Sequence, residues 1–138
     1  MNAPHIDHIG IIVADLDSAV ERLRPLFGDA PMHVKELPEV GLRVAEIHAA
    51  NVVVELLQYA GGDSRFARKV MGERLGLNHI SARVADVERS VTELSAAGFK
   101  PQQGFPRQGA HGRVAFFDPD AVTGLLFEVC QPDADRGT

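Results

Sequence analysis

Cysteine is nearly absent from this chain of 138 residues: Cys130 is the only one, which excludes an internal disulfide framework. An excess of positive charge is also missing, because 14 Lys and Arg stand against 19 Asp and Glu, giving a net charge of −5. The positive charges form no stripe, so nucleic acid is not an expected partner. No apolar run approaches the roughly 18 residues of a membrane-spanning helix, and no basic region precedes an apolar run at the start, so we expect no signal peptide. We therefore expect a cytoplasmic protein without a membrane partner.

The sequence contains instead an internal repeat. Hydrophobic residues make up 45% of the chain, enough for a sizeable core. The length suggests one compact unit or two very small ones packed together, and we treat residues 1–138 as a single domain. Within it, His8 and His79 are each followed at the same distance by Val-Ala-Asp, which ends at Asp15 and Asp86. A constant shift of 71 residues relates the two segments, and it continues into the apolar residues that follow.

A second pair of segments matches in the same order. The stretch "VVVELLQ" contains Glu55 and Gln58, and "LLFEVCQ" contains Glu128 and Gln131, with a shift of 73 residues. Two matching pairs in one order indicate a duplication, and such self-similarity outranks local propensity as a signal of fold.

Each copy has the pattern of a β-α-β-β-β module. The alternation of apolar residues, the Asp residues that can cap helices and the Gly and Pro breaks predict these elements. In the first copy they are a strand at 5–13, a helix from 15 or 17 to 27, and strands at 32–37, 42–49 and 52–59. In the second they are a strand at 77–84, a helix at 87–97, a short strand near 100–103, and strands at 113–117 and 124–130. The predicted fold class is α+β, with module one at about 5–60, a linker helix at about 63–76 and module two at about 77–131.

Four residues of metal-ligand type occupy equivalent places in the two modules. Each module offers one His from its first strand, His8 or His79, and one Glu from its last strand, Glu55 or Glu128. If those strands are neighbours, each His–Glu pair is local, and a pseudo-twofold axis would bring the two pairs together.

A divalent metal would explain this set. A carboxylate in an apolar strand is costly to bury alone, and two at equivalent positions repel unless a proton or cation lies between them. Imidazole and carboxylate together suit Zn²⁺, Mn²⁺, Co²⁺, Ni²⁺ or Fe²⁺. Two nitrogens and two oxygens leave open positions in an octahedral shell for a substrate. Taken singly, each residue has a structural alternative: His8 as a core histidine, Glu55 as a solvent-facing residue of an edge strand.

The repeated unit, with a His early and a Glu late in each copy, resembles the vicinal oxygen chelate superfamily of glyoxalases, bleomycin-resistance proteins and dioxygenases. Within it the chain is most similar to the methylmalonyl-CoA epimerases, over about residues 5–131. The segments that carry the resemblance are "DHIGIIVADLDSA" at 7–19, "VELLQ" at 54–58, "GLNHISARVADV" at 76–87, "GAHG" at 109–112 and "GLLFEV" at 124–129.

The resemblance implies a fold, a metal and a reaction. The two modules would form a curved mixed sheet around a metal-binding cavity, with His8, Glu55, His79 and Glu128 as metal ligands. The reaction would be epimerisation of methylmalonyl-CoA or a related 2-substituted acyl-CoA, by abstraction of the α-proton through a metal-stabilised enolate. Proteins of this kind are commonly homodimers, so a homodimer is the expected assembly.

Two carboxylates are candidates for the acid and base. Some family members place a catalytic Glu in the third strand, where this chain has Val44. Glu46 lies two residues on and therefore on the same face, and His48 lies beyond it. Glu46 is thus a candidate acid/base residue, with a half-exposed strand as the alternative, and Glu128 would serve as both ligand and base.

Three residues are candidates for substrate binding. His111 of the "GAHG" loop would contact the substrate or its phosphates, or else would only support a glycine turn. Arg107 and Arg113 flank the loop and are the nearest cations for an anionic substrate, with surface charge as the alternative.

Two departures from the epimerase pattern leave the substrate open. The chain has Asn78 where family members often carry a second His, and Asp118-Pro119-Asp120 where they usually carry His-Pro-Lys. The acids make a contact with CoA phosphates doubtful at that point. The alternatives are therefore a glyoxalase-like lyase or isomerase of a thiol adduct, and a metal-free small-molecule-binding protein of the bleomycin-resistance type. A ring-cleaving dioxygenase is less favoured, because that chemistry uses two His and one carboxylate, whereas this chain offers a fourth ligand.

Overall fold

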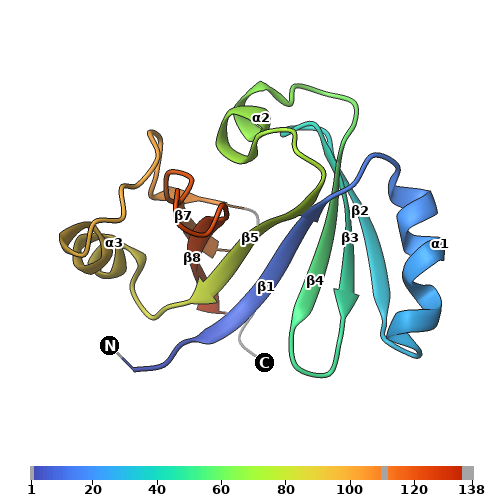
Figure 1. The fold of residues 1–138 in the computed structure, drawn as a ribbon, viewed down its shortest axis with the longest axis horizontal. Coiled ribbons are helices and arrows are strands. Elements are labelled where there is room, and N and C mark those ends of the chain that lie inside the picture. Colours follow the sequence, from blue (N-terminus) through green and yellow to red (C-terminus); the bar gives the residue numbers. More distant parts are fainter. Residues whose placement is uncertain (1, 110–111, 135–138) are drawn as a thin grey trace. The chain divides into compact units, whose positions relative to one another are not determined.

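The computed structural model describes residues 2–109 and 112–134, and its backbone confirms the predicted fold class, α+β with mixed sheets (Figure 1). The chain divides into two compact units, which we call the first unit (His8–Asn78) and the second unit (Met1–Asp7 with His79–Thr138). The first unit also includes the predicted linker helix, the second includes the start of β1 (His5–Ile12), and each unit is described by itself below. No helix among the described residues is long and apolar enough to cross a membrane.

The four strands of the first unit follow one another in the order β2-β3-β4-β1. β1 runs parallel to β4, whereas β2, β3 and β4 are antiparallel to their neighbours. The bounds are β1 His5–Ile12, α1 Leu16–Phe27, β2 Met32–Leu37, β3 Leu42–His48, β4 Val53–Tyr59 and α2 Arg65–Met71. α1 covers one face of this sheet (Figure 1). The apolar residues beneath it include Leu16, Val20, Ala45, Ile47 and Leu56, all buried.

A glycine fixes the turn between β2 and β3. Gly41 has φ of +69°, and a Cβ at this position would lie 2.6 Å from the backbone nitrogen of Ser64. Any other residue would therefore meet both backbone strain and a steric clash. The turn sets the antiparallel register of β2 and β3, in which His33 lies opposite Glu46.

The second unit repeats the arrangement with the strand order β5-β8-β7-β6. β5 is parallel to β8, and β7 is antiparallel to both β8 and β6. The bounds are β5 Gly76–Arg83, α3 Val87–Ala96, β6 Arg107–Gln108, β7 Gly112–Phe116 and β8 Leu126–Pro132. Val87, Ala115, Phe117 and Val129 form the buried apolar cluster between α3 and the sheet.

The two units hold the start of their helix in the same way. Of the two predicted caps, Asp15 and Asp17, Asp15 caps α1, and its side chain accepts a hydrogen bond from the backbone nitrogen of Ser18; Asp86 caps α3 equivalently. The last strand adds a second acceptor to each helix. Gln58 Oε1 accepts from the backbone N–H of Leu16 at 2.7 Å, and Gln131 Oε1 accepts from that of Val87 at 3.1 Å. These two bonds, called the strand–helix ties below, give the repeated Gln a structural role.

Most predicted elements agree with the observed ones within two residues, but three predictions need correction. The strand near 100–103 was wrong: Pro101 makes only an isolated bridge to Phe117, since proline has no N–H for a ladder, and the strand forms later, at Arg107–Gln108. The last strand begins and ends two residues after the predicted bounds. The linker helix is shorter than predicted: it ends at Met71, and Gly72, where φ is +73°, follows it.

Candidate functional site

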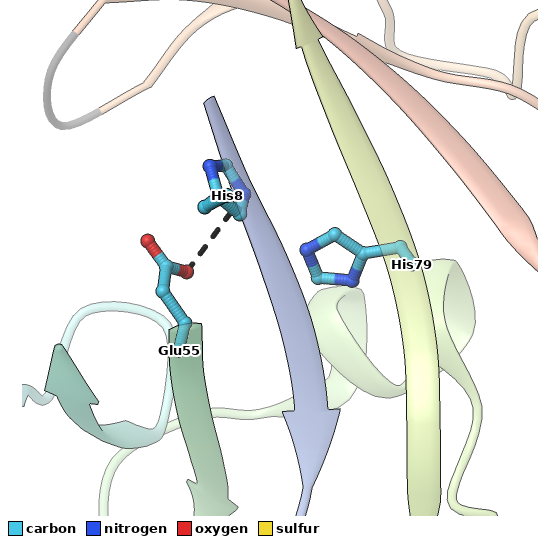
Figure 2. Close-up of side chains that lie close together, drawn as sticks. All are labelled: His8, Glu55 and His79. Atoms are coloured by element: carbon cyan, nitrogen blue, oxygen red, sulfur yellow. Dashed lines mark ion pairs between the residues drawn. The ribbon is translucent and has the colours of Figure 1, made fainter. Parts of the chain in front are cut away.

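In the first unit, His8 and Glu55 come from neighbouring parallel strands and lie on one face of the sheet. Gly10 is in register with Glu55, and His8 with Val53. Nε2 of His8 lies 3.9 Å from Oε1 of Glu55, drawn as a dashed line in Figure 2, and the side chains are only 12% and 19% exposed. The apolar residues Val54 and Leu56 point to the opposite face, under α1. The pair therefore lies on the sheet face opposite α1, largely buried, with both groups retaining some access to solvent.

The second unit contains the equivalent pair on β5 and β8. His79 is in register with Leu126, and Ser81 with Glu128. His79 is 2% exposed and Glu128 is 6% exposed, and the ring of Phe116 meets the imidazole edge-on at a centroid distance of 5.1 Å. Val129, the neighbour of Glu128, points to the opposite face, where it packs against α3. The condition under which each His–Glu pair is local, that its two strands are neighbours, is thus met in both units.

A second carboxylate lies beside the first pair. Glu46 of β3 is directly opposite Glu55 of β4, and it is 12% exposed. Nζ of Lys35 donates to its Oε2 at 3.2 Å, and Nε2 of His48 lies 3.4 Å from its Oε1, without the alignment of a hydrogen bond. The cation of Lys35 compensates the negative charge that this pair of glutamates concentrates on one sheet face.

Val44, which stands where some family members have a catalytic Glu, is buried. It packs with Ile12 and Leu57 in an apolar cluster that also includes Ala67 of α2. Val44 therefore contributes packing only, and Glu46 is the carboxylate that β3 places beside Glu55.

The two units differ in the residues that flank their carboxylates. Glu55 has Gly10 on one side and Glu46 on the other, whereas Glu128 has Ser81 on one side and Phe116 on the other. The surroundings of Glu55 are therefore charged and open, and those of Glu128 are aromatic with one hydroxyl.

The predicted substrate-binding residues have different placements. His111 lies outside the described residues. Arg107 is exposed on β6 in register with Val114, which puts it on the sheet face of Cys130 and Glu128. Arg113 points to the other face, and its guanidinium donates to Glu88 of α3. The structure therefore does not bring Arg113 to the face of Glu128.

The departures from the epimerase pattern have local structural explanations. The amide of Asn78 donates to the carbonyl of Met71 at 2.8 Å and joins the start of β5 to the end of α2. Asp120 accepts hydrogen bonds from the hydroxyl and the backbone N–H of Thr123, which lower the pKa of its carboxyl group. Asp120 thus builds the turn that leads to β8.

Two neighbours of the carboxylates were missed in the sequence. One signal could have indicated Lys35: it lies two residues after His33, and therefore on the same face of β2, the strand that pairs with β3. Ser81 stood inside a segment quoted for its His, but neither spacing nor composition distinguishes a serine beside a ligand from any other strand serine.

The donor set fits a divalent metal. Each unit offers one imidazole nitrogen and one carboxylate oxygen from adjacent strands, and both carboxylates lie in largely apolar strands where a counter-charge lowers the cost of burial. This mixture of nitrogen and oxygen donors suits Mn²⁺, Co²⁺, Zn²⁺, Ni²⁺ or Fe²⁺.

The fold and these paired residues define the class of protein, and the comparison with known families agrees. The Glyoxalase/Bleomycin resistance protein/Dioxygenase superfamily profile matches residues 7–117, and the chain belongs to this superfamily. The proteins of similar sequence include epimerases and a protein of unassigned activity. An ethylmalonyl-CoA/methylmalonyl-CoA epimerase of Cereibacter sphaeroides is 31% identical over 91% of this chain and 96% of its own. An uncharacterised protein of Bacillus subtilis strain 168 is 31% identical over 95% of this chain and 94% of its own.

Solved structures show the same likeness. A variant of Streptomyces coelicolor methylmalonyl-CoA epimerase, in complex with 2-nitronate-propionyl-CoA, matches with a TM-score of 0.71 and 28% identity, over 95% of this chain and 96% of that one. The glyoxalase-like fold that the resemblance implied for the two repeated modules is therefore confirmed.

Proposed function

We propose that this protein is a divalent-metal-dependent epimerase of methylmalonyl-CoA or a related 2-substituted acyl-CoA. The observation that carries the proposal is the duplicated His–Glu pair, which both units place on the sheet face opposite their helix. The identity to epimerases over nearly the whole chain supports the choice of reaction.

The proposed metal ligands are His8, Glu55, His79 and Glu128. A metal held there would act as a Lewis acid toward the carbonyl and carboxylate oxygens of the substrate, which lowers the cost of removing the α-proton. The ligands would bring two negative charges, so the site as a whole would be close to neutral with a divalent ion.

Proton transfer is assigned to carboxylates of this chain. Epimerisation needs one group that removes the proton from the α-carbon and one that returns a proton to the opposite side. We assign these roles to Glu46 and Glu128. Glu46 lies beside Glu55 on β3, and Glu128 lies on the face of β8 opposite α3. The Lys35 ammonium fixes the orientation of Glu46 through its 3.2 Å hydrogen bond.

Binding of the acyl-CoA is assigned to the cations near β6 and β7. The chain carries a net charge of −5, so an anionic substrate depends on local positive groups rather than on the overall field. Arg107 is the placed residue best suited to this role, and His111 and Arg113 remain predictions. A homodimer also remains a prediction.

The test is exchange of the α-proton in D₂O. Protein loaded with Mn²⁺ or Co²⁺ is expected to wash deuterium into the α-position of methylmalonyl-CoA, measured by mass spectrometry. Glu55→Ala should lose most metal binding and with it the exchange, while Glu39→Ala, a change at an exposed residue, should retain both.

The outcomes separate the alternatives. Metal binding without exchange on any of a panel of 2-substituted acyl-CoAs would refute the epimerase assignment, and turnover of a thiol adduct would then identify a glyoxalase-like enzyme. Purified protein that neither contains metal nor takes up added Mn²⁺ or Co²⁺ would favour the metal-free binding protein.

A further inference from the structure

The buried hydroxyl of Ser81, in the second unit, departs from the usual pairing of buried polar groups. The side chain is completely buried, with a relative exposure of 0%, and its Oγ has no hydrogen-bond partner among residues 2–109 and 112–134. Buried hydroxyl groups are nearly always paired, because an unpaired one loses its bonds to water without replacement. An unpaired hydroxyl in the interior therefore calls for an explanation.

The sheet register places this hydroxyl beside a proposed metal ligand. Ser81 of β5 is the in-register neighbour of Glu128 on β8, and both point to the same face. On its other side Glu128 has Phe116, whose side chain cannot donate a hydrogen bond. Of the two in-register neighbours of Glu128, Ser81 is thus the one that can donate to its carboxylate.

The duplication shows that the hydroxyl is not required by the fold. The shift of 71 residues that relates His79 to His8 relates Ser81 to Gly10, and Gly10 is in register with Glu55 as Ser81 is with Glu128. The same strand position is therefore built without any side chain in the first unit. There, Glu55 has the charged Glu46–Lys35 pair on its other side, which the second unit lacks.

We propose that Ser81 is a positioning residue for Glu128 in the metal-loaded protein, an inference that rests on the proposed function. A carboxylate that binds a metal through one oxygen leaves the other oxygen in need of a donor, and such donors orient the ligand. The Ser81 hydroxyl supplies this hydrogen bond. Because no described residue accepts a hydrogen bond from this hydroxyl, its removal should not lower the stability of the metal-free protein.

The experiment titrates metal-free protein with Mn²⁺ in a calorimeter and measures its thermal unfolding before any metal is added. Ser81→Ala is expected to raise the Kd for Mn²⁺ about tenfold, the lower end of the effect of removing such donors. The Tm of the metal-free variant should equal or exceed that of the unaltered protein. Ser81→Thr, which keeps a hydroxyl, should restore the affinity.

Ser90→Ala is the matched control, because Ser90 is a buried serine of the same unit on α3, away from Glu128. It should leave the Kd for Mn²⁺ unchanged. An unchanged Kd in Ser81→Ala would overturn the role of Ser81 while the metal site stands, and so would a lowered Tm of the metal-free variant, which would reveal a structural hydrogen bond. If the unaltered protein binds neither Mn²⁺ nor Co²⁺, the metal site itself is refuted, and the role of Ser81 with it.

Discussion

The strand–helix ties can be broken one at a time. In Gln58→Ala, the N–H of Leu16 at the first turn of α1 loses its 2.7 Å acceptor, and in Gln131→Ala the N–H of Val87 loses its 3.1 Å acceptor. Leu16 and Val87 are both 0% exposed, so water cannot easily take the place of the amide oxygen.

The expected losses follow from burial and distance. Leaving a buried donor unpaired costs about 1–3 kcal/mol, and the shorter bond should be the stronger. We expect a loss of about 2 kcal/mol in the free energy of unfolding for Gln58→Ala and about 1 kcal/mol for Gln131→Ala. At roughly 4 °C per kcal/mol for a chain of this size, Tm should fall by about 8 and 4 °C.

Urea unfolding followed by circular dichroism measures both losses, with an unchanged m value as the sign that only stability has altered. Gln58→Glu keeps an acceptor oxygen at the start of a helix, where negative charge is favourable, and should recover most of the loss. Gln103→Ala changes an exposed glutamine and should have no effect. The reasoning is refuted if both tie variants have a free energy of unfolding within about 0.5 kcal/mol of that of the unaltered protein, a spread typical of surface substitutions.

Two further predictions concern Tyr59 and Lys35. Burial raises the pKa of the Tyr59 phenol to about 12 despite the opposing charge of Arg68. The folded state thus holds its proton more tightly than the unfolded state, and stability should decline as pH rises from about 10 to about 12. Since Tyr59 is the only tyrosine and tryptophan is absent, phenolate absorbance reads this titration directly, and a midpoint near 10 would contradict the prediction. Lys35→Met removes the ion pair that holds Glu46, worth roughly 1 kcal/mol for a half-exposed pair, and should therefore lower kcat for epimerisation about fivefold. Lys35→Arg keeps a cation and should retain the wild-type kcat. Equal kcat values in the two variants would refute a role for Lys35 in orienting Glu46.

The sequence alone predicts the features that occur in both copies of the duplicated module. The helix starts at Asp15 and Asp86 are set by local capping, and the adjacency of the His and Glu strands follows once two copies of one module are recognised. Both depend on short-range patterns that appear twice in the chain.

Features that occur in one copy only were not predictable in the same way. The pairing of Lys35 with Glu46 depends on the β2–β3 register, which a single turn at Gly41 decides. The strand wrongly predicted near Pro101 also depends on pairing with another strand, because the missing N–H of proline matters only where a neighbouring strand would accept a hydrogen bond from it. The burial of the Ser81 hydroxyl follows from packing, which no periodicity encodes.

The strand–helix ties also bear on how a duplicated chain can evolve. Each copy has its own cap, its own Gln and its own His–Glu pair, held by contacts within that copy. The positions beside the carboxylates are then free to diverge: one copy acquired a glycine and a glutamate, the other a serine and a phenylalanine. New specificity can arise at these positions in one half of the gene while the ancestral scaffold is retained in both.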